Sequence, residues 1–186
     1  MSAPRLADVL GQAELVHDRG VLEAAIGDIA AKIHADYAAD ARAPLFVTVM
    51  HGGMPFAAQL GFALGERGLD LEFDYLHATR YRGSTSGSRL AWLHRPATAM
   101  AGRRVLLADD ILDEGHTLAA IRDHCREQGA ARVAIAVLCE KRHARRVAGL
   151  AADFVGVEVP DRYVFGYGMD FHEQGRNLAA IHAVDA

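Results

Sequence analysis

Four acidic residues lie within six positions of the chain, in the stretch RRVLLADDILDEGHTL (103–118). They are Asp109, Asp110, Asp113 and Glu114, and they follow a short apolar run. One acid at such a place is ordinary, because a carboxylate can cap the helix that follows. Four crowded acids repel one another, and capping does not offset that cost. The cluster therefore indicates a site that binds Mg²⁺ or the hydroxyl groups of a sugar.

A glycine follows the acids at the point where a helix is expected to begin. The residues 114–117 offer consecutive backbone N–H groups around Gly115, which suits a phosphate group. Open parallel sheets bind ligands outside the carboxyl ends of their strands, and this stretch follows such a strand. The stretch therefore predicts a ligand that combines a terminal phosphate, a diol and a metal ion.

The elements that must position this stretch alternate along the chain. The apolar pattern predicts helices over 21–39, 55–68 and 117–129, and strands over 45–50, 71–79, 103–108, 132–140 and 153–159. This alternation favours right-handed βαβ units and a mostly parallel sheet. The glycine-rich segment 80–88 is expected to be a loop, and the last segment, 161–186, to fold over the same domain.

Composition limits the class of protein. The chain has 186 residues, 51% of them hydrophobic and 24% charged, which suits a single domain over 1–186. A net charge of -4 argues against broad nucleic-acid binding. The two cysteines, Cys125 and Cys139, are too few for a disulfide framework and suit a reducing compartment. The first twenty residues have no long apolar run, so we expect a cytoplasmic protein without a membrane span.

The acidic stretch resembles a known motif. VLLADDILDEGHTL is similar to the segment with which type I phosphoribosyltransferases bind phosphoribosyl diphosphate (PRPP). Three further segments are similar to the hypoxanthine-guanine phosphoribosyltransferases, and they are VTVMHGGMPFAAQL, LCEKR and DFVGVEVPDRYVFGYGMDFHEQGRNL. Together the similarity covers roughly residues 10–182.

The resemblance implies a fold, a reaction and partners. The fold is the type I phosphoribosyltransferase fold, an α/β architecture with a mostly parallel twisted sheet flanked by helices. Terminal segments form a small hood, and a flexible lid over about 80–95 carries Arg80 and Tyr81. The expected reaction is purine salvage, in which PRPP and hypoxanthine or guanine give IMP or GMP and pyrophosphate. The family also implies Mg²⁺ and a homodimer or homotetramer.

By this resemblance the acidic stretch binds PRPP. Asp109 and Asp110 are expected to bind the 2′- and 3′-hydroxyls of the ribose, directly or with Mg²⁺. Asp113 corresponds to the general base, which takes the proton from purine N7 as N9 attacks C1 of the ribose. The residues expected to hold the 5′-phosphate are Glu114, Gly115, His116 and Thr117.

The other similar segments imply the pyrophosphate and metal sites. Pyrophosphate is expected at His51, Gly52, Gly53 and Arg176. The family often has a cis peptide bond in this loop, here expected between Met50 and His51. The carboxylates expected to accompany Mg²⁺ are Asp109, Asp110 and Asp170.

The purine site is implied near the end of the chain. Lys141 corresponds to the residue that donates to the 6-oxo group, which discriminates against a 6-amino purine. On local sequence alone, Lys141 in the basic run KRHARR would be an ordinary exposed residue. Tyr163 is expected to stack on the base, Val164 to contact its edge through the backbone, and Asp170 to complete this site.

Four residues depart from the commonest family pattern. His51 and His116 stand where lysine is frequent, and Asp109 stands where glutamate is usual. Glu114 replaces threonine or serine beside the phosphate. If the Glu114 side chain points into the phosphate site, its charge should weaken PRPP binding; if only its N–H faces the phosphate, binding is retained.

Two alternative functions remain open on the sequence. The first is a phosphoribosyltransferase that prefers xanthine and guanine. The second is a non-catalytic regulator of the same fold that senses PRPP or nucleotides and binds nucleic acid. A regulator should lack the base or the purine lysine and should carry a basic face. Asp113 and Lys141 are both present and the net charge is negative, which favours the enzyme.

Overall fold

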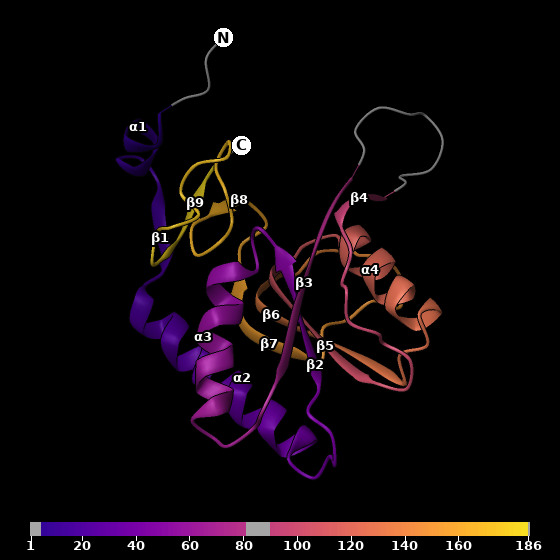
Figure 1. Cartoon of the computed structure of the whole chain (residues 1–186). Coiled ribbons are helices and arrows are strands. Elements are labelled where there is room, and N and C mark those ends of the chain that lie inside the picture. Colours follow the sequence, from indigo (N-terminus) through magenta and orange to yellow (C-terminus); the bar gives the residue numbers. More distant parts are fainter. Residues whose placement is uncertain (1–4, 81–89, 186) are drawn as a thin grey trace.

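A six-stranded sheet forms the centre of the computed structural model, which describes residues 5–80 and 90–185 (Figure 1). Its strands lie side by side in the order β4-β3-β2-β5-β6-β7. Their bounds are β2 Leu45–Met50, β3 Glu72–Arg80, β4 Leu90–His94, β5 Arg104–Leu112, β6 Arg132–Lys141 and β7 Phe154–Val159. All neighbouring pairs are parallel except β3 and β4, which are antiparallel. The prediction of a mostly parallel sheet is confirmed.

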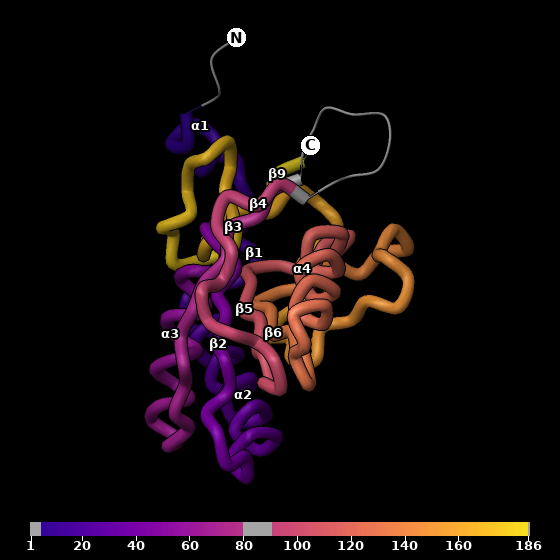
Figure 2. Tube along the Cα trace, turned by 45° about the vertical axis from the view of Figure 1, so that its right-hand side comes forward, coloured from indigo at the N-terminus to yellow at the C-terminus, as the bar shows by residue number. Residues whose placement is uncertain are grey.

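Helices cover both faces of this sheet. The helices α2 (Arg19–Tyr37) and α3 (Met54–Gly65) lie on one face, and α4 (His116–Glu127) lies on the other (Figure 2). Strand β2 is buried on both sides because its apolar side chains alternate between two hydrophobic cores. Phe46 packs in the core that includes α2 and α3, whereas Leu45 and Val47 pack in the core that includes α4.

The two ends of the chain meet in a second, smaller sheet. Strand β1 (Glu14–His17) pairs with β9 (Ile181–Val184), and β9 pairs with β8 (Tyr163–Phe165), both in antiparallel fashion. The short helix α1 (Leu6–Leu10) precedes this sheet. Figure 1 shows the three strands together beside the N-terminal end of α3. The hood predicted from the terminal segments is therefore confirmed.

Strand β5 continues four residues past its predicted end at Ala108. The prediction was wrong here, because it ended the strand at the two acids. Pairing with β6 keeps the backbone extended, with Asp109 opposite Val137 and Leu112 opposite Glu140. The first two acids of the cluster thus belong to the strand, and only 113–115 form the turn that leads into α4.

Part of the segment predicted as a lid is a strand. Residues 90–94 form strand β4, with Trp92 opposite Ala78 of β3, so cross-strand pairing holds this part of the segment in place. Arg80 is the last residue of β3. Tyr81 and the rest of 81–89 lie outside the described residues. In the described parts of the chain, no helix has the length and apolar character needed to cross a membrane.

Candidate active site

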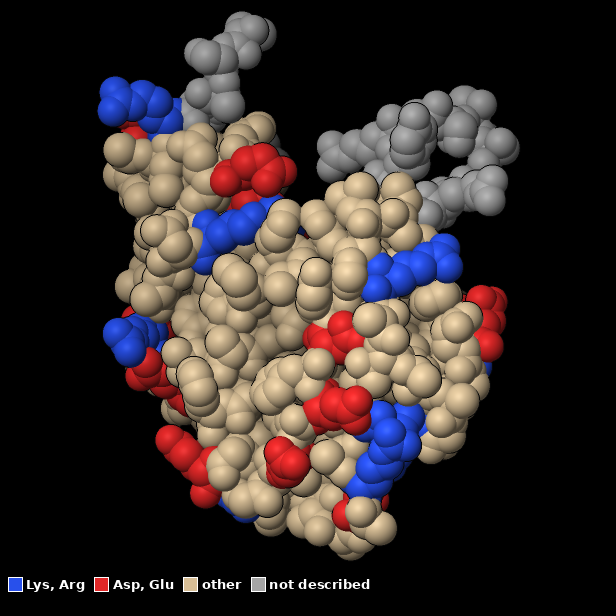
Figure 3. All heavy atoms as spheres, in the orientation of Figure 1, with Lys and Arg blue, Asp and Glu red and all other residues tan. Residues whose placement is uncertain are grey.

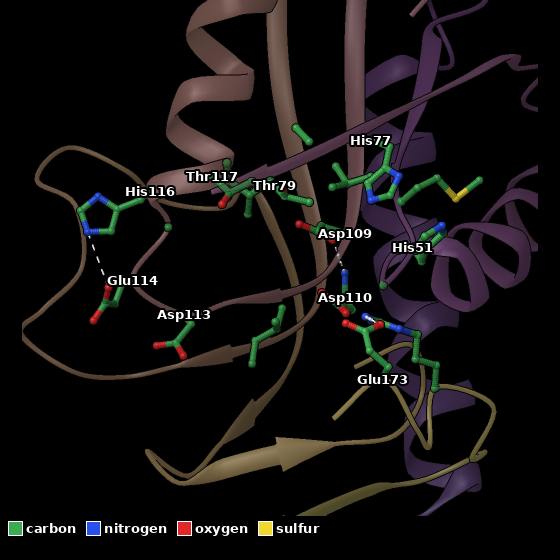
Figure 4. A pocket seen from close by; sticks show the side chains of 18 residues that line it. His51, His77, Thr79, Asp109, Asp110, Asp113, Glu114, His116, Thr117 and Glu173 are labelled. Carbon is green, nitrogen blue, oxygen red and sulfur yellow. Dashed lines mark hydrogen bonds and ion pairs between the residues drawn. The ribbon is translucent and has the colours of Figure 1, made fainter. Parts of the chain in front are cut away.

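A cavity of about 550 Å³ opens at the carboxyl ends of β2, β3 and β5, beside the first turn of α4 (Figure 4). This is the position at which parallel sheets bind ligands. Most of the predicted PRPP and pyrophosphate residues line it, namely His51, Gly52, Asp109, Asp110, Asp113, Glu114, Gly115, His116, Thr117 and Arg176. Segments that lie far apart in the sequence are thus brought together around one cavity.

Asp109 and Asp110 form a buried acid pair at the floor of the cavity. Their residues are 9% and 8% exposed, and the Asp110 N–H donates to Asp109 Oδ1 over 2.9 Å. Burial and the adjacent Asp110 charge raise the pKa of Asp109 well above its ordinary value, and burial also raises the pKa of Asp110. Two buried carboxylates side by side are a hard oxygen donor set, so the pair fits a divalent cation such as Mg²⁺.

The loop at residues 51–53 packs directly against this pair. A Cβ atom on Gly52 would lie 2.0 Å from Asp110 Oδ2, so only glycine leaves room for the carboxylate. The peptide bond between Met50 and His51 is cis, which confirms the expectation from resemblance. Gly53, the last residue of this loop, is buried and is the N-cap residue of α3.

The residues predicted to hold the phosphate lie at the start of α4. Gly115 is the N-cap residue and has a φ of 83°, a left-handed conformation that favours glycine. Helix N-termini present free N–H groups and a positive dipole end, which suit a phosphate. The Glu114 carboxylate lies beside two side chains, since Oε1 is 3.7 Å from Arg145 Nε and Oε2 is 3.6 Å from His116 Nε2. The charge of Arg145 lessens the repulsion that Glu114 would exert on a phosphate.

Asp113 lies between the cavity and two donors, Lys141 at the end of β6 and His143 just after it. Lys141 Nζ donates to Asp113 Oδ2 over 2.9 Å, and His143 Nε2 lies 2.6 Å from Oδ1. Burial alone would raise the pKa of Asp113, but the hydrogen bonds from Lys141 and His143 outweigh it and hold that pKa below its ordinary value. Lys141 is only 9% exposed, so the interpretation of Lys141 as an ordinary exposed residue is wrong.

The predicted purine residues do not line this cavity. Lys141 donates a hydrogen bond to Asp113, and Asp113 lines the cavity. The Tyr163 hydroxyl donates to the Asp170 carbonyl oxygen over 3.1 Å, and Val164 is buried opposite Ala183 in the hood. The carboxylate of Asp170 lies 2.7 Å from Arg176 and accepts from the Glu173 N–H over 2.9 Å. Its association with a metal therefore stays a prediction.

Comparison with known proteins shows which family the chain belongs to. Residues 12–172 match the family model described as the phosphoribosyl transferase domain. The hypoxanthine-guanine phosphoribosyltransferase of Streptococcus pneumoniae strain R6 is 35% identical over 154 residues, which span 82% of each chain. The corresponding Bacillus subtilis strain 168 protein is 37% identical over 139 residues, 74% of this chain and 75% of its own. This chain belongs to the hypoxanthine-guanine phosphoribosyltransferases.

Solved structures show the same fold as this phosphoribosyltransferase. A hypoxanthine phosphoribosyltransferase from Staphylococcus aureus superposes with a TM-score of 0.85 at 24% identity, over 97% of each chain. A hypoxanthine-guanine phosphoribosyltransferase from Bacillus anthracis gives a TM-score of 0.80 at 26% identity, over 91% of this chain and 96% of its own. The type I fold expected from the sequence is therefore confirmed.

Sequence reasoning missed three polar residues that line the cavity of this phosphoribosyltransferase, namely His77, Thr79 and Glu173. The rings of His77 and His51 lie 4.3 Å apart between centroids, side by side in Figure 4. Burial, then the neighbouring His51 and Arg176, lower the pKa of His77. His77 and Thr79 lie at the carboxyl end of a strand that was predicted, so the rule that ligands bind at strand ends could have found them.

Proposed function

We propose that this enzyme transfers the 5-phosphoribosyl group from PRPP to hypoxanthine, guanine or both, and releases pyrophosphate. The observation that carries the proposal is the position of Asp113. Its carboxylate lines the cavity that holds the acid pair and the start of α4, and it also accepts a hydrogen bond from Lys141. A base that faces both substrates is what the reaction requires.

The cavity has a place for each part of PRPP. The ribose hydroxyls would be held by Asp109 and Asp110, and the 5′-phosphate by the backbone of 114–117 with the Thr117 hydroxyl. The pyrophosphate would lie against the loop of residues 51–53 and Arg176, whose charge suits it. Mg²⁺ would be held by Asp109 and Asp110, with Asp170 as the third proposed carboxylate, and would neutralise the leaving pyrophosphate.

The reaction exchanges one bond at C1 of the ribose for another. The C1–O bond breaks and its electron pair leaves with pyrophosphate, while purine N9 forms a new bond to C1. The transition state carries positive charge on the ribose, which Asp109 and Asp110 stabilise. The proton on purine N7 passes to Asp113. Since a carboxylate is a weak base, the position of Asp113 matters more than its basicity.

Lys141 is proposed to select the purine. An ammonium group that already donates to Asp113 can donate a second N–H to a 6-oxo group, whereas a 6-amino group would leave that second buried N–H without an acceptor. Tyr163 would stack on the base and Val164 would contact it through the backbone. Basic and acidic side chains are interspersed on the face drawn in Figure 3, which supports a small-molecule substrate over nucleic acid.

A base panel tests this proposal. The enzyme is incubated with PRPP, Mg²⁺ and one of hypoxanthine, guanine, xanthine or adenine, and nucleotide formation is followed by absorbance. We expect IMP or GMP from the first two bases and far slower use of adenine. Preferential use of xanthine and guanine would support the alternative specificity. No nucleotide from any base would exclude the enzyme, and equal use of adenine would exclude the role given to Lys141.

We also propose that the chain forms a homodimer or homotetramer in the cytoplasm. Phe62 of α3 and Phe73 of β3 are 72% and 60% exposed and line a shallow cavity of about 500 Å³. Exposed aromatic side chains around such a hollow are typical of protein contacts. Cys125 and Cys139 are free and buried, which suits a reducing compartment. Light scattering should show an oligomer for the native chain and a smaller species for Phe73→Glu; a native monomer would contradict this.

A further inference from the structure

The base Asp113 has a second partner that neither the motif nor the fold assigns. His143 lies in the segment after β6, and its side chain is only 4% exposed. Its Nε2 atom lies 2.6 Å from Asp113 Oδ1, while Lys141 occupies Oδ2 over 2.9 Å. Each oxygen of the carboxylate thus has its own donor, and these two donors come from one short segment.

The contact at the other ring nitrogen of His143 shows which nitrogen carries the proton. The backbone N–H of Arg145 points at His143 Nδ1 over 3.2 Å. A neutral imidazole that accepts at Nδ1 carries its proton on Nε2, so Nε2 is the donor toward Asp113. The backbone of the segment therefore sets the ring in the form that can hold the carboxylate.

We propose that His143 is a positioning residue for the general base, whose Nε2–H fixes Asp113 Oδ1 while Lys141 fixes Oδ2. Two donors on two oxygens set the plane of a carboxylate that would otherwise rotate about its Cβ–Cγ bond. The lone pairs left over are those available to the proton on purine N7. The inference rests on the proposed function, because it concerns the base of that reaction.

Among the described residues, the other charged side chains near Asp113 have partners of their own. Side-chain ligand atoms of Asp113, His143 and Asp161 lie within 4.8 Å of one another. Asp161 accepts two hydrogen bonds from Arg145, over 2.9 and 2.6 Å, which offset its charge. The Arg145 guanidinium also lies 3.7 Å from Glu114. Lys141 and His143 are therefore the groups through which Asp113 is held.

Two substitutions at one position separate this role from simple packing. His143→Phe keeps an aromatic ring but removes the donor, whereas His143→Gln keeps an N–H donor near the place of Nε2. For His143→Phe we expect kcat to fall about tenfold to a hundredfold because the base is misplaced, with the KM for PRPP nearly unchanged. The acid limb of the kcat profile should move to higher pH, since Asp113 loses a stabilising donor. His143→Gln should recover most of both effects.

Two NMR measurements test the contact without relying on activity. In the native enzyme, ¹⁵N shifts of His143 should show a neutral ring with its proton on Nε2. The ¹³C signal of the Asp113 carboxyl should titrate at higher pH in His143→Phe than in the native enzyme. A proton on Nδ1, an unmoved Asp113 titration, or equal losses in the two variants would each overturn the inference.

Failure of this inference can be told from failure of the proposed function. If the native enzyme forms no nucleotide, the proposed function fails, whereas the NMR measurements still test the contact. If the native enzyme is active and His143→Phe keeps its kcat and its acid limb, only the role of His143 fails. If His143→Phe does not fold, as seen by circular dichroism, the native ¹⁵N shifts and the activity of His143→Gln decide.

Discussion

At the scale of residues, the site depends on acids whose pKa values are shifted in opposite directions. Burial raises the pKa values of Asp109 and Asp110, and the Asp110 charge further raises that of Asp109, so a bound cation would favour the charged form of the pair. Asp113 is the opposite case, because its two donors outweigh the effect of burial and lower its pKa. Asp113 therefore stays ionised at neutral pH, which is the state that can accept a proton.

The substitution Asp113→Asn tests this assignment. An asparagine of almost the same shape cannot take the proton from purine N7, so we expect kcat to fall by about 10²- to 10⁴-fold. PRPP should still bind, because the acid pair and the start of α4 are unchanged, and calorimetry would measure this. Asp28→Asn, an exposed position on α2, is the matched control and should keep native turnover. Native turnover in Asp113→Asn would remove Asp113 as the base.

At the scale of elements, the cavity depends on how closely the loop before α3 approaches the end of β5. The contact of Gly52 with Asp110 leaves no room for a side chain, since a Cβ atom would lie 2.0 Å from Oδ2. Gly53 is also tightly enclosed, since a Cβ atom on Gly53 would lie only 2.6 Å from the carbonyl oxygen of Ala108. The loop and the strand therefore act as one rigid unit that sets the place of the acid pair.

Gly52→Ala should disrupt that unit. The added methyl group must displace Asp110 or the loop, and we expect kcat/KM for PRPP to fall by about a hundredfold. Gly27→Ala in α2 is the matched control, because nothing lies within 4 Å of its Cβ position. Removing a helical glycine should stabilise the fold by about 0.5–1 kcal/mol and leave activity unchanged. Steady-state kinetics would check both variants, and native kinetics in Gly52→Ala would contradict the close approach.

A half-buried carboxylate, Asp74, connects β3 to the segment that follows β4. Asp74 accepts hydrogen bonds from the backbone N–H groups of Tyr75 and Thr98, over 2.7 and 2.8 Å. Burial opposes its charge, but these N–H groups outweigh it and lower the pKa of Asp74. A lowered pKa stabilises the fold above the ordinary carboxyl range, and this contribution is lost as the pH falls through that range to the folded-state pKa.

Asp74→Asn should therefore cost stability in a pH-dependent way. At pH 7 we expect a loss of about 1–3 kcal/mol in the free energy of unfolding, because an amide replaces a charged acceptor of two N–H groups. The difference from the native enzyme should shrink as the pH falls toward 3. Urea denaturation at several pH values measures it, with Asp28→Asn as the control. A difference that is the same at every pH would contradict the role of the charge.

The elements show which features could be read from the sequence. Strand β2 was predicted with its observed bounds, because a run of apolar residues ends at a glycine turn. The prediction ended strand β5 too early, at Ala108, because acids are rare in strands. Only the pairing of β5 with β6 reveals its full length. Strand β4 was missed because it depends on antiparallel pairing with β3, a tertiary contact.

The site shows the same limit. The acids and the glycine of the phosphate loop were found by type and spacing, whereas Lys141 was found only through the resemblance to the family. The contacts of Asp113 with Lys141 and His143 span 28 and 30 residues, so local sequence contains no sign of them. His143 stands in a basic run of ordinary appearance, and only its burial against Asp113 distinguishes it.

At the scale of the whole molecule, the cavity is shared by the sheet and the segment within the hood. Strand β5 supplies the acid pair and the turn after it supplies the base, whereas Arg176 and Glu173 come from the segment between β8 and β9. Arg176 is held there by Asp170 and by the Gly168 carbonyl oxygen, at 2.7 and 2.8 Å. The pyrophosphate of PRPP would therefore meet the positive charge of Arg176 only when the sheet and the segment between β8 and β9 are both in place.

The most direct test of the whole account is the product balance of the native enzyme. Purified enzyme is mixed with PRPP, hypoxanthine and Mg²⁺, and all reactants and products are separated and quantified. We expect one IMP and one pyrophosphate for each hypoxanthine consumed, and no turnover when EDTA removes Mg²⁺. Unchanged hypoxanthine, or PRPP broken down to ribose 5-phosphate without IMP, would contradict the assignment of this cavity to phosphoribosyl transfer.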